Sequence, residues 1–140
     1  MFEIVHTVTD WYDRPRQGIA DYRGQPHLFE SKWRDSEGLF EDTFLLMPIE
    51  TATLTLALED WAIWRRWETA FHQDKTTQET HPALPEDRDR HEDLKRLLEG
   101  RLTVDPAHAV RASAEFRVRK DPGWSGYGWQ PLEAQWSDPL

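Results

Sequence analysis

The chain contains no cysteine among its 140 residues. Disulfide bonds, thiolate metal sites and cysteine nucleophiles are therefore excluded. The sequence also lacks an uninterrupted apolar run of about 18 residues, which is the length that a membrane-spanning helix needs. Its first residues do not follow the basic-then-apolar order of a signal peptide. We therefore expect a soluble cytosolic protein that has no membrane partner.

Basic residues are scarce relative to acidic ones. Seventeen Lys and Arg stand against 26 Asp and Glu, which gives a formal net charge of −9 at pH 7. A chain of this sign repels phosphate backbones, so nucleic acid is not an expected partner. The acidic excess lies in residues 1–100, because residues 101–140 carry five groups of each sign. This distribution favours contact with a basic protein partner.

Motifs for catalysis and metal binding are absent as well. Phosphate-binding loops, serine-hydrolase motifs and zinc-finger spacings do not occur. The chain has six histidines, but no His-Glu-x-x-His pair, and His72 and His81 lie on an expected flexible loop. We therefore expect no metal site and no cofactor. His6 falls at a core position of an alternating strand, and we interpret it as a hydrogen-bonded interior histidine.

Large aromatic side chains compensate for the small share of apolar residues. The hydrophobic fraction is only 38%, but the chain has eight Trp, six Phe and three Tyr. Each of these can bury about 150–250 Å², so the core can be rich in aromatic rings. A chain of this length suffices for one core and is short for two. Because no linker or repeat divides it, residues 1–140 are expected to form a single domain.

Alternation of apolar and polar residues predicts strands toward both ends of the chain. The expected strands cover residues 2–9, 18–22, 27–33, 39–47, 110–118 and 129–136. In the first of them, Ile4, His6 and Val8 share the expected core face. Residues 23–26 form a Gly- and Pro-bearing turn signal. Pro131 places the last strand at a sheet edge, because proline cannot donate to the strand ladder.

Between these strands the apolar period changes to that of helices. The first helix has an apolar stripe wide enough to be covered on two sides. We assign its Trp61, Trp64 and Trp67 to the core, with a groove for an apolar partner as the alternative. A second helix is expected after Pro85, with Gly100 as its stop signal. The order predicts an α+β fold with an antiparallel sheet of five to six strands, a C-terminal hairpin, and both helices packed on one face.

The densest group of chemically active side chains falls at residues 10–18, which we expect to form a loop between strands. Arg14 or Arg16 could hold a carboxylate or phosphate there, with Asp10 or Asp13 as a base. The alternative is that aromatic residues anchor the loop while its charges pair locally. Arg16 is the preferred ligand contact and is expected to be exposed.

A second aromatic group lies in the glycine-rich segment 123–129. It could be a recognition surface, or its rings could cover the end of the core. The candidate binding residues are therefore Asp10, Trp11, Tyr12, Asp13, Arg14, Arg16, Trp124, Tyr127 and Trp129.

These features favour a small acidic binding protein without catalysis, comparable in size and charge to immunity or inhibitor proteins. Its expected partner is another protein or a second copy of itself, since an edge strand and segregated charge favour a homodimer. The alternative is a small hydrolase or transferase that binds an anionic ligand at residues 10–18. A cavity where Arg16, Asp13 and a histidine meet would favour the enzyme, whereas a flat acidic or aromatic face would favour the binding protein.

Overall fold

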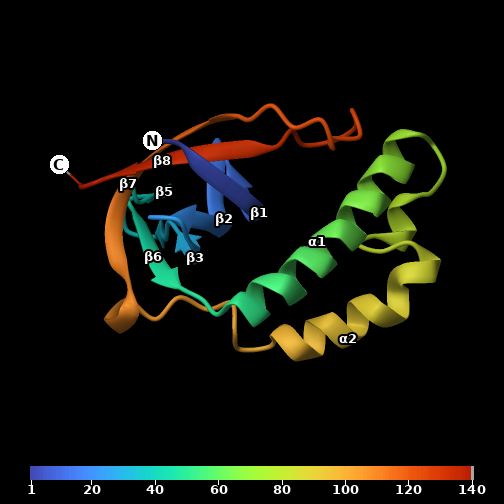
Figure 1. Ribbon diagram of the computed structural model, residues 1–140, viewed down its shortest axis with the longest axis horizontal. Coiled ribbons are helices and arrows are strands. Elements are labelled where there is room, and N and C mark those ends of the chain that lie inside the picture. The colour runs from blue at the N-terminus through green and yellow to red at the C-terminus, as the bar shows by residue number, and fades with distance from the viewer. Residues whose placement is uncertain (140) are drawn as a thin grey trace.

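Six antiparallel strands close into a barrel in the computed structural model of the chain, which describes residues 1–139 (Figure 1). The barrel strands are β1 (Glu3–Tyr12), β2 (Arg14–Tyr22), β3 (Gln25–Glu30), β6 (Phe44–Pro48), β7 (Val110–Val118) and β8 (Leu132–Ser137). They are hydrogen-bonded in the order β1-β2-β3-β6-β7-β8, and β8 returns to pair with β1. The α+β fold and its antiparallel sheet are confirmed, with the sheet closed on itself.

Closure removes the sheet edge that Pro131 was expected to mark. Leu132 in β8 lies opposite Val118 on one side and Val5 on the other. Pro131 directly precedes the strand, and its carbonyl accepts a hydrogen bond of 2.9 Å from the Arg119 backbone N–H. The edge assignment is wrong because the missing proline N–H falls just before the ladder begins.

Two neighbouring residues form the turn between β2 and β3. Arg23 and Gly24 both have positive φ, 54° and 76°, as a two-residue hairpin turn requires. The predicted turn is thereby confirmed. Further along, β4 (Trp33–Arg34) and β5 (Leu39–Phe40) form a separate small hairpin between β3 and β6. This hairpin takes up Trp33, Leu39 and Phe40, which the predicted strands 27–33 and 39–47 include.

The alternation predicts the buried residues of the first strand only in part, because Val8 is buried as expected but Ile4 is not. Ile4 is 38% exposed, whereas Val5 and Thr7 are buried. The pairing of β1 with β2 shifts register three times, first between Val5 and Thr7. At this irregularity Thr7 Oγ1 accepts a hydrogen bond of 3.1 Å from the Ile19 backbone N–H. Bulges change the face to which side chains point, so a strict period of two cannot hold along this strand.

Aromatic rings fill the interior of the barrel. Phe29 and Phe44 are fully buried, and Phe116 and Trp136 pack against both. All pairs among these four rings have centroids between 5.7 and 6.1 Å apart. Tilted and edge-to-face arrangements of this kind are favourable beyond the area they bury. The barrel is therefore a packed core rather than an open channel.

The helices lie together on one side of the barrel (Figure 1). α1 (Thr51–His72) starts at the barrel and runs away from it, and α2 (Arg88–Leu98) returns beside it. The other helical elements among the described residues are three short 3-10 helices, η1 (Gln78–Thr80), η2 (Pro85–Asp87) and η3 (Pro106–His108). Between the helices, Ile63, Ala83 and Leu94 form a small buried cluster. Within residues 1–139, no helix has the length and apolar character to cross a membrane.

We expect Phe44→Ala to lower the free energy of unfolding by about 3–5 kcal/mol, because the cavity left among the rings cannot collapse fully. Urea unfolding measures the loss. Val110→Ala is the matched control, since Val110 lies in the same sheet but is 50% exposed. Its cost should stay below about 1 kcal/mol. Equal losses in the two variants would contradict the placement of Phe44.

Candidate functional site

Residues 10–18 form a continuous hairpin instead of the expected loop. β1 continues to Tyr12 and β2 begins at Arg14, so that only Asp13 remains as a turn, with φ of 59°. The loop prediction is wrong because aspartate tolerates the left-handed conformation, which lets both strands extend to the tip. Neighbouring residues of a strand face opposite sides, and Trp11 and Tyr12 accordingly contact different rings.

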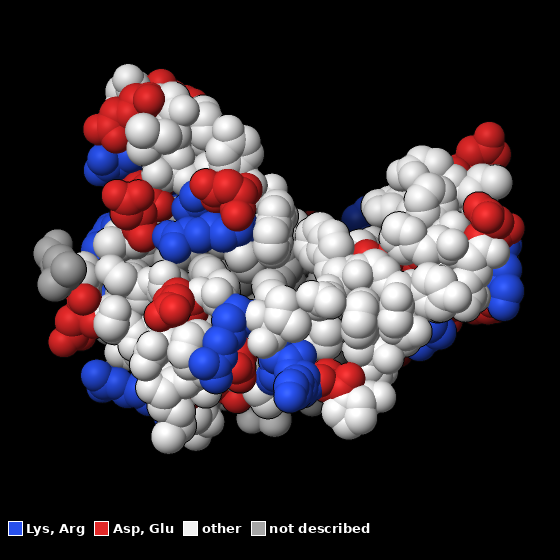
Figure 2. Space-filling model, turned by 90° about the horizontal axis from the view of Figure 1, so that it is seen from above, with Lys and Arg blue, Asp and Glu red and all other residues white. Residues whose placement is uncertain are grey.

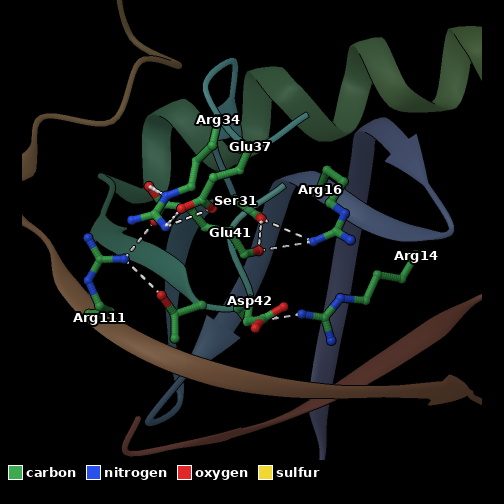
Figure 3. A network of polar contacts seen from close by, with 9 residues as sticks. Arg14, Arg16, Ser31, Arg34, Glu37, Glu41, Asp42 and Arg111 are labelled. Carbon is green, nitrogen blue, oxygen red and sulfur yellow. Dashed lines mark hydrogen bonds and ion pairs between the residues drawn. The ribbon is translucent and has the colours of Figure 1, made fainter. Parts of the chain in front are cut away.

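Arg16 is part of the barrel wall rather than an exposed ligand contact. It is only 7% exposed, and its guanidinium lies 4.8 Å from the centroid of the Phe40 ring. Its N–H groups donate to the Glu41 carbonyl and to Ser31 Oγ at 3.3 and 3.1 Å (Figure 3). They also donate to the Tyr12 carbonyl at 3.1 Å and to the Asp13 carboxylate at 2.7 Å. The expected exposure is wrong because acceptors of three neighbouring segments surround this side chain.

Arg14 is turned toward the barrel in the same way. Its guanidinium lies 5.0 Å from the centroid of the Phe44 ring, and it donates to the carbonyls of Ala114 and Asp42 at 3.2 and 3.0 Å (Figure 3). Burial lowers the pKa of Arg14, and the nearby charge of Arg16 lowers it further. The two arginines thus tie the chain between β3 and β6 to the barrel.

The polar network continues outward through Glu41 (Figure 3). Its carboxylate accepts a hydrogen bond of 2.8 Å from Arg111 and lies 3.6 Å from Arg34 Nε. The hydrogen bond from Arg111 lowers the pKa of Glu41. Arg34 also pairs with Glu37 at 3.1 Å. These contacts hold the β4-β5 hairpin in place, so the network is structural.

On the opposite face of the β1-β2 hairpin, a groove runs between β1 and α1. It consists of two adjoining cavities of about 870 and 520 Å³, and Thr7, Val8, Trp61 and Trp129 line both. We call the two cavities together the indole groove. Figure 2 shows the surface hollowed between two raised ends of the molecule, with mainly uncharged side chains in the hollow and charged ones at both ends and along the lower middle of the view.

Four tryptophans from three segments form a connected row in this groove. Trp11 of β1 lies 5.6 Å from Trp129, Trp129 lies 5.4 Å from Trp64 of α1, and Trp64 lies 5.0 Å from Trp61. Trp11 and Trp129 are 46% and 42% exposed, and the two helical indoles are half-buried. The core assignment is therefore confirmed for Trp67, which is 5% exposed. Trp61 and Trp64 are only partly buried: Trp61 packs against the barrel core, and both line the groove that was the alternative.

The nine candidate residues do not form one site. Those that line the groove are Trp11, Trp124 and Trp129. Those on the other side or at the tip of the hairpin are Asp10, Tyr12, Asp13, Arg14 and Arg16. Tyr127 is 39% exposed on the glycine-rich segment, where its carbonyl accepts a hydrogen bond from Trp124 Nε1 at 3.2 Å. Trp11 of the first group thus lines the groove together with Trp124 and Trp129 of the second, while the other members of the first group lie away from it.

A buried carboxylate holds the glycine-rich segment against α1. Glu68 is 4% exposed, pairs with Arg65 and accepts a hydrogen bond of 3.4 Å from the Trp129 backbone N–H. Gly128 has a φ of 73°, and a Cβ there would lie 2.0 Å from the Glu68 carboxyl group. A second contact joins Thr69 Oγ1 to Ser125 Oγ at 3.2 Å. This arrangement fixes Trp129 at the mouth of the groove.

Sequence reasoning missed Glu68, which resembles an ordinary solvated helix charge. The signal that could have found it is its position four residues after Trp64, on the same face of the helix. Burial raises the pKa of its carboxyl group, although the neighbouring Arg65 opposes this effect.

Charged groups at the groove are mostly paired with one another. In the larger cavity Arg66 makes two hydrogen bonds of 3.0 Å to Asp87, and Arg119 pairs with Asp121 at 3.2 Å. In the smaller one Asp60 lies 2.6 Å from His91 Nδ1 and joins α1 to α2. Within residues 1–139, no group of three or more His, Asp or Glu side chains is placed to hold a metal ion. The groove therefore offers a mainly apolar surface to a ligand, part of it the faces of tryptophan rings.

His6 fits its interpretation as a hydrogen-bonded histidine, since its Nε2 lies 2.9 Å from Asp21 Oδ1 and its side chain is 17% exposed.

Comparisons with protein-family models, curated proteins and solved structures found no match to this chain. The function is therefore argued from the geometry of the site.

We expect Arg16→Ala to lower the free energy of unfolding by about 1–3 kcal/mol, because its acceptors lose their donors inside the barrel wall. Arg16→Lys should restore only part of the loss, since an ammonium group cannot reproduce the guanidinium fork. Urea unfolding measures both. The control is Arg101→Ala, at an exposed position, which should change stability by less than about 0.5 kcal/mol. If Arg16→Ala had the same free energy of unfolding as the wild type, the structural role of Arg16 would be refuted.

Glu68→Gln should gain stability relative to the wild type as the pH rises from about 4 to about 7. The raised pKa means that the folded protein keeps a proton on Glu68 which the unfolded chain releases near pH 4.3, about the ordinary glutamate value. The stability that this proton contributes is complete below the ordinary glutamate pKa, and it is lost as the pH rises through the raised pKa of Glu68. Glutamine mimics the protonated form and avoids the loss.

Urea unfolding at several pH values tests this expectation. Glu92→Gln, at an exposed position of α2, controls for the removal of one negative charge. If the difference between Glu68→Gln and the wild type stayed constant with pH, Glu68 would not be the group responsible.

Proposed function

We propose that the chain is a binding protein without catalytic activity, and that it holds a protein partner in the indole groove. The observation that carries this proposal is the row of Trp11, Trp61, Trp64 and Trp129 along one concave surface. Sites of roughly 300–1,000 Å³ with mainly apolar walls are typical of ligand binding. Tryptophan is also among the residues most enriched where binding energy is concentrated.

The partner is an apolar segment that inserts aromatic or proline side chains between the indoles. Grooves lined by aromatic rings recognise proline-rich segments in this way, because ring faces pack against the flat pyrrolidine. The mainly uncharged side chains in the hollow of this face (Figure 2) support such a partner over a strongly charged one. Glu68 also holds the backbone of Trp129 in place, which supports the proposal because a rigid site loses less entropy on binding.

Five hydrogen bonds support binding over the alternative of a hydrolase or transferase at residues 10–18. The guanidinium groups of Arg14 and Arg16 donate to two carbonyls of barrel strands, Ala114 and Tyr12, and to two of the chain before β6, Asp42 and Glu41. The Asp13 carboxylate is engaged with Arg16. An incoming anion would have to displace these internal partners before either arginine could hold it.

A selection from a displayed peptide library against the wild-type chain tests the proposal. We expect enriched peptides that carry aromatic or proline residues and that bind Trp129→Leu about tenfold more weakly, as the loss of an aromatic contact implies. Trp33→Leu is the matched control, because Trp33 is also exposed, at 46%, but belongs to the β4-β5 hairpin. Isothermal titration calorimetry measures each affinity.

Two outcomes would contradict the proposal. Peptides that bind Trp129→Leu and the wild type equally would place the site elsewhere. Light scattering that gives twice the mass of 16.6 kDa for the wild type, and the single mass for Trp129→Leu, would make a second copy the occupant of the groove.

A further inference from the structure

A second group of exposed rings lies on the other face of the β1-β2 hairpin. Tyr12, Trp33 and Phe40 contact one another, with centroid distances of 5.1 Å between Trp33 and Phe40, 5.5 Å between Tyr12 and Phe40, and 6.3 Å between Tyr12 and Trp33. Tyr12 is 59% exposed and Trp33 is 46% exposed. We call these three residues the hairpin patch. Contiguous exposed rings of this kind mark interaction sites.

The hairpin patch rests on a rigid base. The Phe40 ring lies against the guanidinium of Arg16, which the barrel carbonyls hold in place. Beneath it, Ser31 Oγ donates a hydrogen bond of 2.7 Å to the Glu41 carbonyl, and the Glu41 backbone N–H donates to the Lys32 carbonyl at 2.8 Å. The rings are therefore pre-positioned, which reduces the entropy that a partner has to remove.

Acidic side chains outnumber basic ones around the hairpin patch, although Lys32 and Arg34 are also exposed. Residues 10–16 and 30–42, which carry the patch, contain seven acidic and four basic side chains. Two of the four basic groups, Arg14 and Arg16, point inward to carbonyl oxygens (Figure 3). The carboxylates face solvent instead, with Asp13 at 64% and Glu37 at 49% side-chain exposure. The outward field at the patch is therefore acidic.

We propose that the hairpin patch is a second binding surface, and that its occupant is a basic segment of a protein partner. Lysine or arginine side chains of that segment lie over the exposed ring faces of Tyr12 and Trp33, where a cation is attracted to the aromatic quadrupole. The carboxylates of Asp13 and Glu37, which already pair with Arg16 and Arg34, are solvent-exposed and face the remaining positive charge.

Charge selects this occupant over the two other candidates. A second copy of the chain would bring the same carboxylates face to face, and each copy carries a net charge of −9. A nucleic acid would be repelled for the same reason. The surface is separate from the indole groove, because Trp11 and Tyr12 face opposite sides of one strand. The proposal therefore stands or falls independently of the proposed function.

The test is the binding of a fluorescein-labelled peptide of eight lysines, followed by fluorescence anisotropy at low and moderate salt. Trp33→Leu is expected to weaken binding about fivefold, as the loss of an exposed cation–π contact implies. Trp33→Phe keeps a ring face and should retain most of the affinity. Asp35 and Glu37 are exposed carboxylates in the turn between β4 and β5. The double variant Asp35→Asn with Glu37→Gln should weaken binding and reduce its dependence on salt, since fewer charges are paired.

Matched controls separate a specific surface from general attraction to an acidic protein. Glu86→Gln with Asp89→Asn removes two exposed carboxylates from the helical side and should change the affinity less than twofold, about the scale of an unpaired surface charge. Trp129→Leu removes an exposed indole from the groove and should leave the affinity for the lysine peptide unchanged. Urea unfolding of each variant confirms that it is folded before binding is compared.

Three results would overturn the proposal. Equal losses in the patch and helical charge variants would show attraction to net charge alone. Unchanged binding in Trp33→Leu would remove the rings from the surface. A loss in Trp129→Leu without one in Trp33→Leu would place the basic peptide in the indole groove, and would leave the groove's role as a binding site standing.

Discussion

Closure of the sheet is the constraint on which the rest of the structure depends. Because β8 is hydrogen-bonded to both β7 and β1, each barrel strand has two neighbours, and segments outside the barrel leave and return at fixed points. The helical pair leaves after β6 and returns at β7, and these strands are themselves paired. α1 is thereby anchored at one end and diverges from the barrel, so that one wall of the indole groove comes from each (Figure 1).

One hairpin serves two surfaces. Extension of β1 and β2 to a turn at Asp13 places Trp11 against the indole groove and Tyr12 in the hairpin patch. The arginines of β2 fill the barrel end, where they donate to the carbonyl oxygens of Ala114, Tyr12 and Glu41. Basic groups therefore stabilise the interior of this end while carboxylates determine the charge of its surface.

The groove depends on a carboxylate that the bulk charge of the chain conceals. Glu68 occupies space that only a glycine at position 128 leaves open, and it holds the backbone of Trp129. Glu68 differs from the exposed carboxylates of this acidic chain, because it is buried and positions Trp129. Its raised pKa follows from the same burial. Stability of the site and its pH dependence are therefore consequences of one contact.

The sequence by itself determined the local elements. Strand 110–118 and the turn at Arg23 and Gly24 follow from alternation and turn chemistry, which involve neighbouring residues only. Tertiary structure decided barrel closure, which pairs Glu3 with Ala134, and the inward direction of Arg16, whose acceptors come from three segments. It also decided which tryptophans line a groove, because the exposure of a ring depends on the surfaces that meet it, and those surfaces are distant in sequence.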